Sequence, residues 1–95
     1  ITVPPECDPG HVYHLFPVLA ERRDALQALL REHGVETLIH YPVPIPRQPA
    51  VQTEHPATCP VADRVCAQEL SLPMYPALPE ADVQAVAESI GKFGV

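Results

Sequence analysis

Proline restricts this chain more than any other residue type, since it accounts for 13 of the 95 residues. Four of these prolines fall within YPVPIPRQPAV, residues 41–51. Each proline fixes its own φ angle, removes a backbone donor and pushes the preceding residue into an extended conformation. We therefore predict that residues 42–58 form a stiff loop rather than a helix or a central strand. Such a loop holds its side chains in place with little conformational entropy left to lose on binding.

The remaining sequence alternates between strand-like and helix-like patterns. Three segments are expected to be extended, namely residues 11–20, 35–41 and 71–75. Three amphipathic segments are expected to be helices, namely residues 21–34, 59 to about 70, and 79 to about 93. Pro17 places the first strand at an edge or a bulge, and Gly34 is expected to end the first helix. This order predicts an α+β fold: a small two-layer domain in which three helices pack on a sheet of about three strands.

The last predicted helix carries the clearest amphipathic pattern. Its apolar residues recur at helical spacing and are Val83, Val86, Ala87, Ile90 and Phe93. We expect this stripe to pack against the sheet, with Val83, Val86 and Ile90 buried.

Composition narrows the function classes. An apolar content of 46% is typical of a globular protein. A net charge of −6 disfavours nucleic acid and anionic membranes as partners, because no basic patch is present to neutralise phosphates. No apolar run approaches the ~20 residues that span a bilayer, and the first residues do not resemble a signal peptide. The chain lacks an initiator Met, which suggests a piece of something longer.

The three cysteines give little support to a metal site. Cys7, Cys59 and Cys66 are odd in number and lack CxxC spacing, so zinc ligation is not predicted and a reducing cytoplasm is the simplest interpretation. His11 and His14 are expected on opposite faces of the first strand, where they could not share a metal ion.

Few residues suggest an autonomous active site. The single lysine is Lys92, near the end of the last predicted helix, and Ser71 and Ser89 have no His-Asp arrangement nearby in the sequence. A reactive pair of Cys59 with His55 is a minor alternative. His40 and Tyr41 differ from these, because they end a predicted strand and begin the stiff loop, and strand ends often border sites. From the residues alone, a ligand role and a structural role for His40 both stay open.

The sequence also resembles a known family. Four stretches together resemble the carboxy-terminal part of the DegT/DnrJ/EryC1/StrS aminotransferases. They are HVYHLFPV, ERRDALQALLREHGVETLIHYPVP, RQPA and CPVADRVCAQELSLPMYPALPEADVQAV. The resemblance covers about residues 10–90, and IHYPVP, QPA and LSLPMYP are its most specific motifs. It implies that residues 1–95 are the small domain of a homodimeric enzyme that transfers an amino group, typically from glutamate, to a nucleotide-linked keto-sugar. Pyridoxal phosphate would be bound by a larger domain absent from this chain.

The resemblance also implies roles for particular residues. His40 and Tyr41 match the family's His-Tyr pair, which contacts the pyrophosphate of the nucleotide-sugar, and both side chains can donate to phosphoryl oxygens. Arg47 could add a charge-assisted bond to the same anion. His14 matches a family histidine for which substrate contact and structural support are both open. Departures at Pro46 and Val51, where many members have His and Tyr, suggest a changed substrate preference.

Other functions remain as alternatives. The family also includes sugar dehydratases that use the same cofactor and an aromatic amino-acid-forming synthase. Two alternatives belong to other function classes. One is a stand-alone ligand-binding module, and the other is a pure interaction domain with an apolar surface formed by VPIP and PALP.

Overall fold

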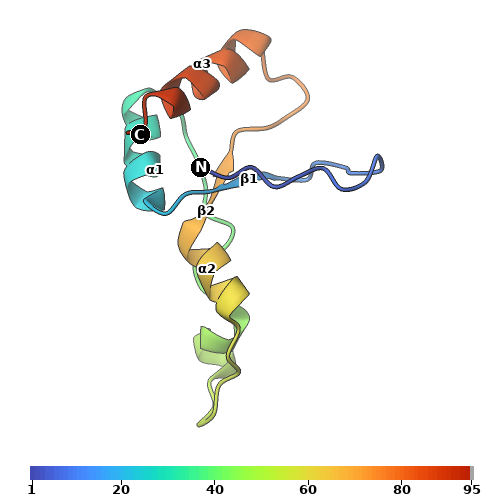
Figure 1. The fold of residues 1–95 in the computed structure, drawn as a ribbon, viewed down its shortest axis with the longest axis vertical. Coiled ribbons are helices and arrows are strands. Elements are labelled where there is room, and N and C mark those ends of the chain that lie inside the picture. Colours follow the sequence, from blue (N-terminus) through green and yellow to red (C-terminus); the bar gives the residue numbers. More distant parts are fainter. Residues whose placement is uncertain (95) are drawn as a thin grey trace.

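The structure is a computed structural model in which residues 1–94 are described. It contains strand β1 (Phe16–Leu19), helix α1 (Arg23–Glu32), helix α2 (Pro60–Gln68), strand β2 (Glu69–Leu72) and helix α3 (Glu80–Gly91). Two short 3-10 turns, η1 (Ile45–Arg47) and η2 (Pro49–Val51), lie between α1 and α2. The two strands pair antiparallel, with Phe16 opposite Leu72 and Leu19 opposite Glu69. The predicted α+β class with three helices is confirmed (Figure 1).

The core lies where α1 meets the small sheet. Its buried side chains come from β1, α1, β2 and the residues that flank them: Val18, Ala20, Leu26, Leu30, Val35 and Leu70. Leu26 and Leu30 are four residues apart and therefore point from one face of α1. Gly34 follows the helix with a φ of 77°, a left-handed conformation that ends α1 as its sequence predicts.

The sheet has two strands rather than about three. Residues 35–41, predicted as a strand, contribute one isolated bridge in which Leu38 exchanges backbone hydrogen bonds of 3.2 and 2.7 Å with Ser71. On the opposite edge, Thr2 forms a similar bridge with Leu19. The strand predicted over 71–75 instead covers Glu69–Leu72, and it stops where Pro73 can no longer donate to a neighbouring strand.

The first strand is also shorter than predicted. It begins at Phe16, so His11 and His14 lie in an exposed segment before it and not on two faces of a strand. Tyr13 has a φ of 49°, and this left-handed residue is incompatible with a continuous extended segment over 11–20.

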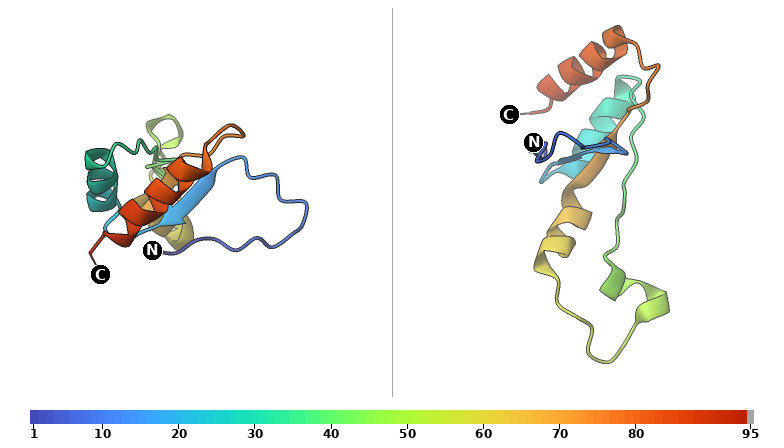
Figure 2. Two further views of the ribbon diagram at one scale, coloured as in Figure 1. Left: turned by 90° about the horizontal axis from the view of Figure 1, so that it is seen from above. Right: turned by 90° about the vertical axis from the view of Figure 1, so that its right-hand side faces the viewer.

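The packing of α3 differs from the prediction. The helix lies beside α1 (Figure 2), where Val86, Ile90 and Phe93 pack against the core. Val83 is 50% exposed and Ala87 is also exposed, so the expectation that Val83 is buried against the sheet is wrong. Val86 and Ile90, also expected to be buried, are only partly buried. The buried residue of α3 is Ser89, whose hydroxyl donates to the carbonyl oxygen of Ala85 at 2.8 Å.

The proline-rich segment forms an arm that projects away from this body. Together with α2 it makes the long end of a molecule measuring 50 × 33 × 23 Å (Figures 1 and 2). Prolines occupy the first turns of η1 and η2, where their fixed φ fits and the missing N–H costs nothing. The prediction that residues 42–58 contain neither an α-helix nor a strand is confirmed. No helix within residues 1–94 is both long enough and apolar enough to cross a membrane.

Candidate functional site

His40 lies at the base of the arm and is fixed there by two buried residues of β2. Its backbone N–H donates to Oε2 of Glu69 at 2.6 Å, and its ring Nδ1 lies 2.8 Å from Oγ of Ser71. The Ser71 hydroxyl donates to Oε1 of Glu69 at 2.5 Å. Glu69 is only 3% exposed and Ser71 only 5%. The three residues therefore form a closed hydrogen-bonded cluster, which we call the His40–Ser71–Glu69 cluster.

The local sequence explains how this cluster forms. In the ELSL strand, alternate side chains point to opposite faces, so Leu70 enters the core while Glu69 and Ser71 share the other face. The bridge between Leu38 and Ser71 is antiparallel, and its register places His40 opposite Glu69. In a regular antiparallel ladder the His40 N–H would donate to the backbone carbonyl of Glu69, but here it donates to the Glu69 carboxylate, and the carbonyl accepts from Arg23.

Burial of Glu69 needs compensation, because a carboxylate removed from water is costly unless it is hydrogen-bonded. Both carboxylate oxygens accept bonds from the cluster. Arg23 lies close by, but its Nη1 donates at 3.0 Å to the backbone oxygen of Glu69 and at 3.1 Å to that of Cys66. The guanidinium thus joins the end of α2 to the start of α1, while the carboxylate is left to hold the His40 segment.

Tyr41 stands next to the cluster on the solvent side. It is 68% exposed, and its ring meets the His40 ring edge-on with centroids 5.4 Å apart. The peptide bond between the two residues is cis. An aromatic hydroxyl exposed beside a fixed imidazole gives two polar groups for one ligand.

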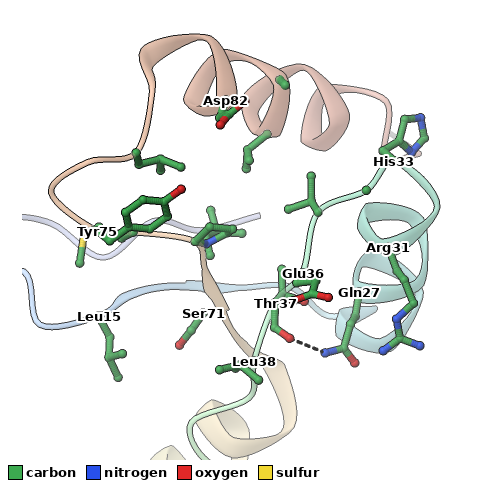
Figure 3. Close-up of a pocket in the computed structure, with 18 of the residues that line it drawn as sticks. Leu15, Gln27, Arg31, His33, Glu36, Thr37, Leu38, Ser71, Tyr75 and Asp82 are labelled. Carbon is green, nitrogen blue, oxygen red and sulfur yellow. Dashed lines mark hydrogen bonds between the residues drawn. The ribbon is translucent and has the colours of Figure 1, made fainter.

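An open cavity of about 880 Å³ begins at this cluster. His40 and Ser71 are part of its wall, and residues from α1, α3 and the segment before α3 complete it, including Arg31, Tyr75 and Asp82 (Figure 3). Thr37 also faces the cavity, and its carbonyl oxygen accepts a 3.4 Å bond from Gln27. The cavity is polar on several sides and wide enough to admit a small ligand.

The other predicted site residues lie apart from this pair. Arg47 belongs to η1 in the arm and forms a forked ion pair with Asp63 of α2, with Nε–Oδ1 at 3.0 Å and Nη2–Oδ2 at 3.1 Å. His14 lies in the exposed segment before β1. The structure thus brings His40 and Tyr41 together, and it places Arg47 and His14 on other elements.

The described residues do not fit pyridoxal phosphate. Lys92, the single lysine of the sequence, is exposed at the end of α3 and is not part of the cavity wall beside His40. Within residues 1–94, no group of three His, Cys, Asp or Glu side chains is placed to hold a metal ion.

Sequence reasoning missed Glu69 and Ser71. No His-Asp arrangement lies near Ser71 in the sequence, because its partner His40 is 31 residues away. The available signal was the alternation in ELSL, which places two polar side chains on one face of a strand whose other face is apolar.

Comparison with known proteins extends these observations. Residues 1–91 match the model of the DegT/DnrJ/EryC1/StrS aminotransferase family. The chain is 34% identical to a dTDP-3-amino-3,6-dideoxy-alpha-D-galactopyranose transaminase of Aneurinibacillus thermoaerophilus, over 92% of this chain and 24% of that protein. It is 39% identical to a UDP-2-acetamido-2-deoxy-3-oxo-D-glucuronate aminotransferase of Pseudomonas aeruginosa, over 83% of this chain and 22% of that protein.

A solved structure shares the fold. The crystal structure of DesV from S. venezuelae superimposes on 92% of this chain with a TM-score of 0.81 and 40% sequence identity, and the match covers 24% of the DesV chain. The chain therefore spans about a quarter of the length of the relatives it matches.

Proposed function

The chain belongs to the DegT/DnrJ/EryC1/StrS aminotransferase family, and we propose that it is the small carboxy-terminal domain of a nucleotide-sugar aminotransferase. In that enzyme, pyridoxal phosphate held by the larger domain supplies the electron sink for amino transfer. The present chain contributes one wall of the substrate cleft. The amino donor is glutamate, the acceptor is a keto-sugar linked to a nucleoside diphosphate, and the enzyme is a cytoplasmic homodimer.

Within this proposal, His40 and Tyr41 bind the pyrophosphate of the substrate. The observation that carries it is the pairing of His40, which β2 holds by its backbone N–H and by Nδ1 of its ring, with an exposed phenol beside it. Because the imidazole is already fixed in the free protein, little side-chain entropy is lost when an anion binds. The pyrophosphate is the one anionic group common to the dTDP- and UDP-linked compounds in the names of the two relatives.

Arg47 is a second anion contact in this proposal. Its guanidinium uses Nε and one terminal nitrogen on Asp63, so the other terminal nitrogen is available to a phosphoryl oxygen. His14 completes the proposed set of substrate contacts, from the segment before β1.

Calorimetric titration of the full-length protein tests the pyrophosphate contact directly. We expect dTDP or UDP to bind more tightly than thymidine or uridine, and Tyr41→Phe to weaken only the diphosphate. Tyr13→Phe removes a hydroxyl that donates to Glu6 in the segment before β1 and serves as the control. Equal affinity for the diphosphate and the nucleoside, in wild type and Tyr41→Phe alike, would contradict the proposal.

A further inference from the structure

Glu69 is a buried acid for which the pyrophosphate contact itself has no use. It lies behind His40, away from solvent, and reaches the imidazole through Ser71. We propose that Glu69 and Ser71 are positioning residues that keep a proton on Nδ1 of His40 and so reserve Nε2 for the substrate's pyrophosphate. This inference rests on the proposed role of His40.

Counting the protons in the cluster shows which group donates in the hydrogen bond between His40 and Ser71. A serine hydroxyl has one hydrogen, and that of Ser71 is donated to Oε1 of Glu69 at 2.5 Å. The 2.8 Å contact between Ser71 Oγ and His40 Nδ1 therefore needs its hydrogen from the ring. Ser71 accepts from Nδ1–H, and the second ring nitrogen, Nε2, is the one left for a ligand.

The charge state of the ring in the complex follows from the anion that it binds. With Nδ1 protonated, Nε2 can donate to a phosphoryl oxygen only when the ring is an imidazolium. The charged or titratable groups that contact His40 directly or through one hydrogen bond are Glu69, reached by its backbone N–H and through Ser71, and the Tyr41 ring at its edge. Arg23 bonds the backbone oxygen of Glu69 and does not neutralise its carboxylate. A cationic His40 would therefore complement both the buried carboxylate and the bound anion.

This arrangement predicts selectivity as well as affinity. A neutral ring with its proton on Nδ1 offers only an acceptor at Nε2 and cannot bond a phosphoryl oxygen, whereas an imidazolium donates to that oxygen through a charge-assisted hydrogen bond. A cationic His40 held in this way therefore binds a diphosphate more strongly than an uncharged hydroxyl.

A purely structural cluster predicts a different outcome. If Glu69 and Ser71 only hold residues 38–40 against β2, then their loss destabilises the protein. The rates of the enzyme's two half-reactions, one with the amino donor and one with the nucleotide-sugar, then fall together. A positioning role acts through His40, so its loss affects the nucleotide-sugar half-reaction and depends on His40 being present.

A double-mutant cycle in the full-length enzyme separates these cases. The variants are His40→Ala, Ser71→Ala and the double variant, with Ser71→Thr retaining the hydroxyl. Ser89→Ala is the matched control, because Ser89 is also buried at 5% exposure but bonds a helix carbonyl of α3. The readouts are kcat/KM for a dTDP-linked keto-sugar and the rate of the half-reaction with the amino donor, at matched folded concentration.

We expect Ser71→Ala to lower kcat/KM for the sugar about tenfold, the loss from a misplaced charge-assisted hydrogen bond. The amino-donor half-reaction should stay within about twofold, Ser71→Thr should restore most of the loss, and Ser89→Ala should leave both half-reactions unchanged. In the His40→Ala background, Ser71→Ala should cause no further loss.

The outcomes distinguish this inference from the proposed function. If His40→Ala leaves the sugar half-reaction intact, the pyrophosphate role fails and this inference fails with it. If His40→Ala lowers that half-reaction but Ser71→Ala does not, or the two losses multiply, only the positioning role is overturned. A measurement on the unaltered protein covers the case in which Ser71→Ala does not fold. In a nitrogen-15 histidine spectrum assigned with His40→Ala, a protonated Nδ1 supports the inference, and an unprotonated Nδ1 with a protonated Nε2 contradicts it.

Discussion

His40 lies opposite Glu69 in the antiparallel register set by the Leu38–Ser71 bridge, and its backbone N–H donates to the Glu69 carboxylate at 2.6 Å. A side chain of β2 thus replaces the backbone carbonyl of β2 that would accept this N–H in a regular antiparallel ladder. The contact fixes the last residue before the exposed Tyr41 and the proline-rich arm.

This contact makes Glu69 important for stability. Glu69→Ala removes the acceptor of both the His40 N–H and the Ser71 hydroxyl and leaves buried donors unpaired. We expect a loss of about 2–4 kcal/mol in the free energy of unfolding, measured with urea. Glu32→Ala, an exposed glutamate at the end of α1, should change it by less than about 0.5 kcal/mol. Equal effects of the two variants would show that the carboxylate does not hold the segment.

Replacing Gly34 should destabilise the protein through backbone strain alone. Its φ is 77°, and a Cβ built there meets no atom within 4 Å, so Gly34→Ala is strained but not crowded. The expected cost is roughly 1–2 kcal/mol. Gly91→Ala has equally open surroundings without the left-handed backbone, and it should be neutral or stabilising by up to about 1 kcal/mol. Thermal unfolding of the two variants measures the difference, and similar midpoints would contradict the assigned helix ending.

The inner face of α3 can be checked with two aliphatic residues. Ile90 packs against the core, and Ile90→Ala should cost roughly 2–4 kcal/mol. Val83 is 50% exposed, so Val83→Ala should cost under about 0.5 kcal/mol. If urea unfolding gives the larger loss of unfolding free energy for Val83→Ala, then α3 does not pack through the face that carries Val86 and Ile90.

Sequence patterns identified the helices better than the sheet. Leu26 and Leu30 mark α1, and Gly34 marks its end, because helix formation depends on local spacing and local backbone freedom. The extent of a strand depends on partners far along the chain, and for residues 35–41 only Leu38 finds a backbone partner across from it. The sequence motif makes His40 and Tyr41 candidates, but the His40–Ser71 contact joins residues 31 positions apart and has no local signal.

Substitution of Arg47 tests whether the arm contributes a contact to the substrate anion. Its ion pair with Asp63 is solvent-exposed, so breaking it should change stability by less than about 1 kcal/mol. If the guanidinium also contacts the substrate anion, Arg47→Ala should lower kcat/KM for the nucleotide-sugar about tenfold. Asp63→Asn frees the guanidinium and should leave kcat/KM equal or higher. Steady-state kinetics of the full-length enzyme decide this, and equal losses in both variants would indicate that only the ion pair matters.

The most direct test of the pyrophosphate role uses His40→Ala and Tyr41→Phe in the full-length enzyme, with the two half-reactions measured separately by rapid mixing. His55→Ala, an exposed histidine of the arm, is the control. The amino donor carries no pyrophosphate, so its half-reaction should stay within about twofold of wild type, while kcat/KM for the nucleotide-sugar falls about ten- to a hundredfold. Equal losses in both half-reactions, at matched concentrations of folded enzyme, would contradict the assignment of His40 and Tyr41 to the pyrophosphate.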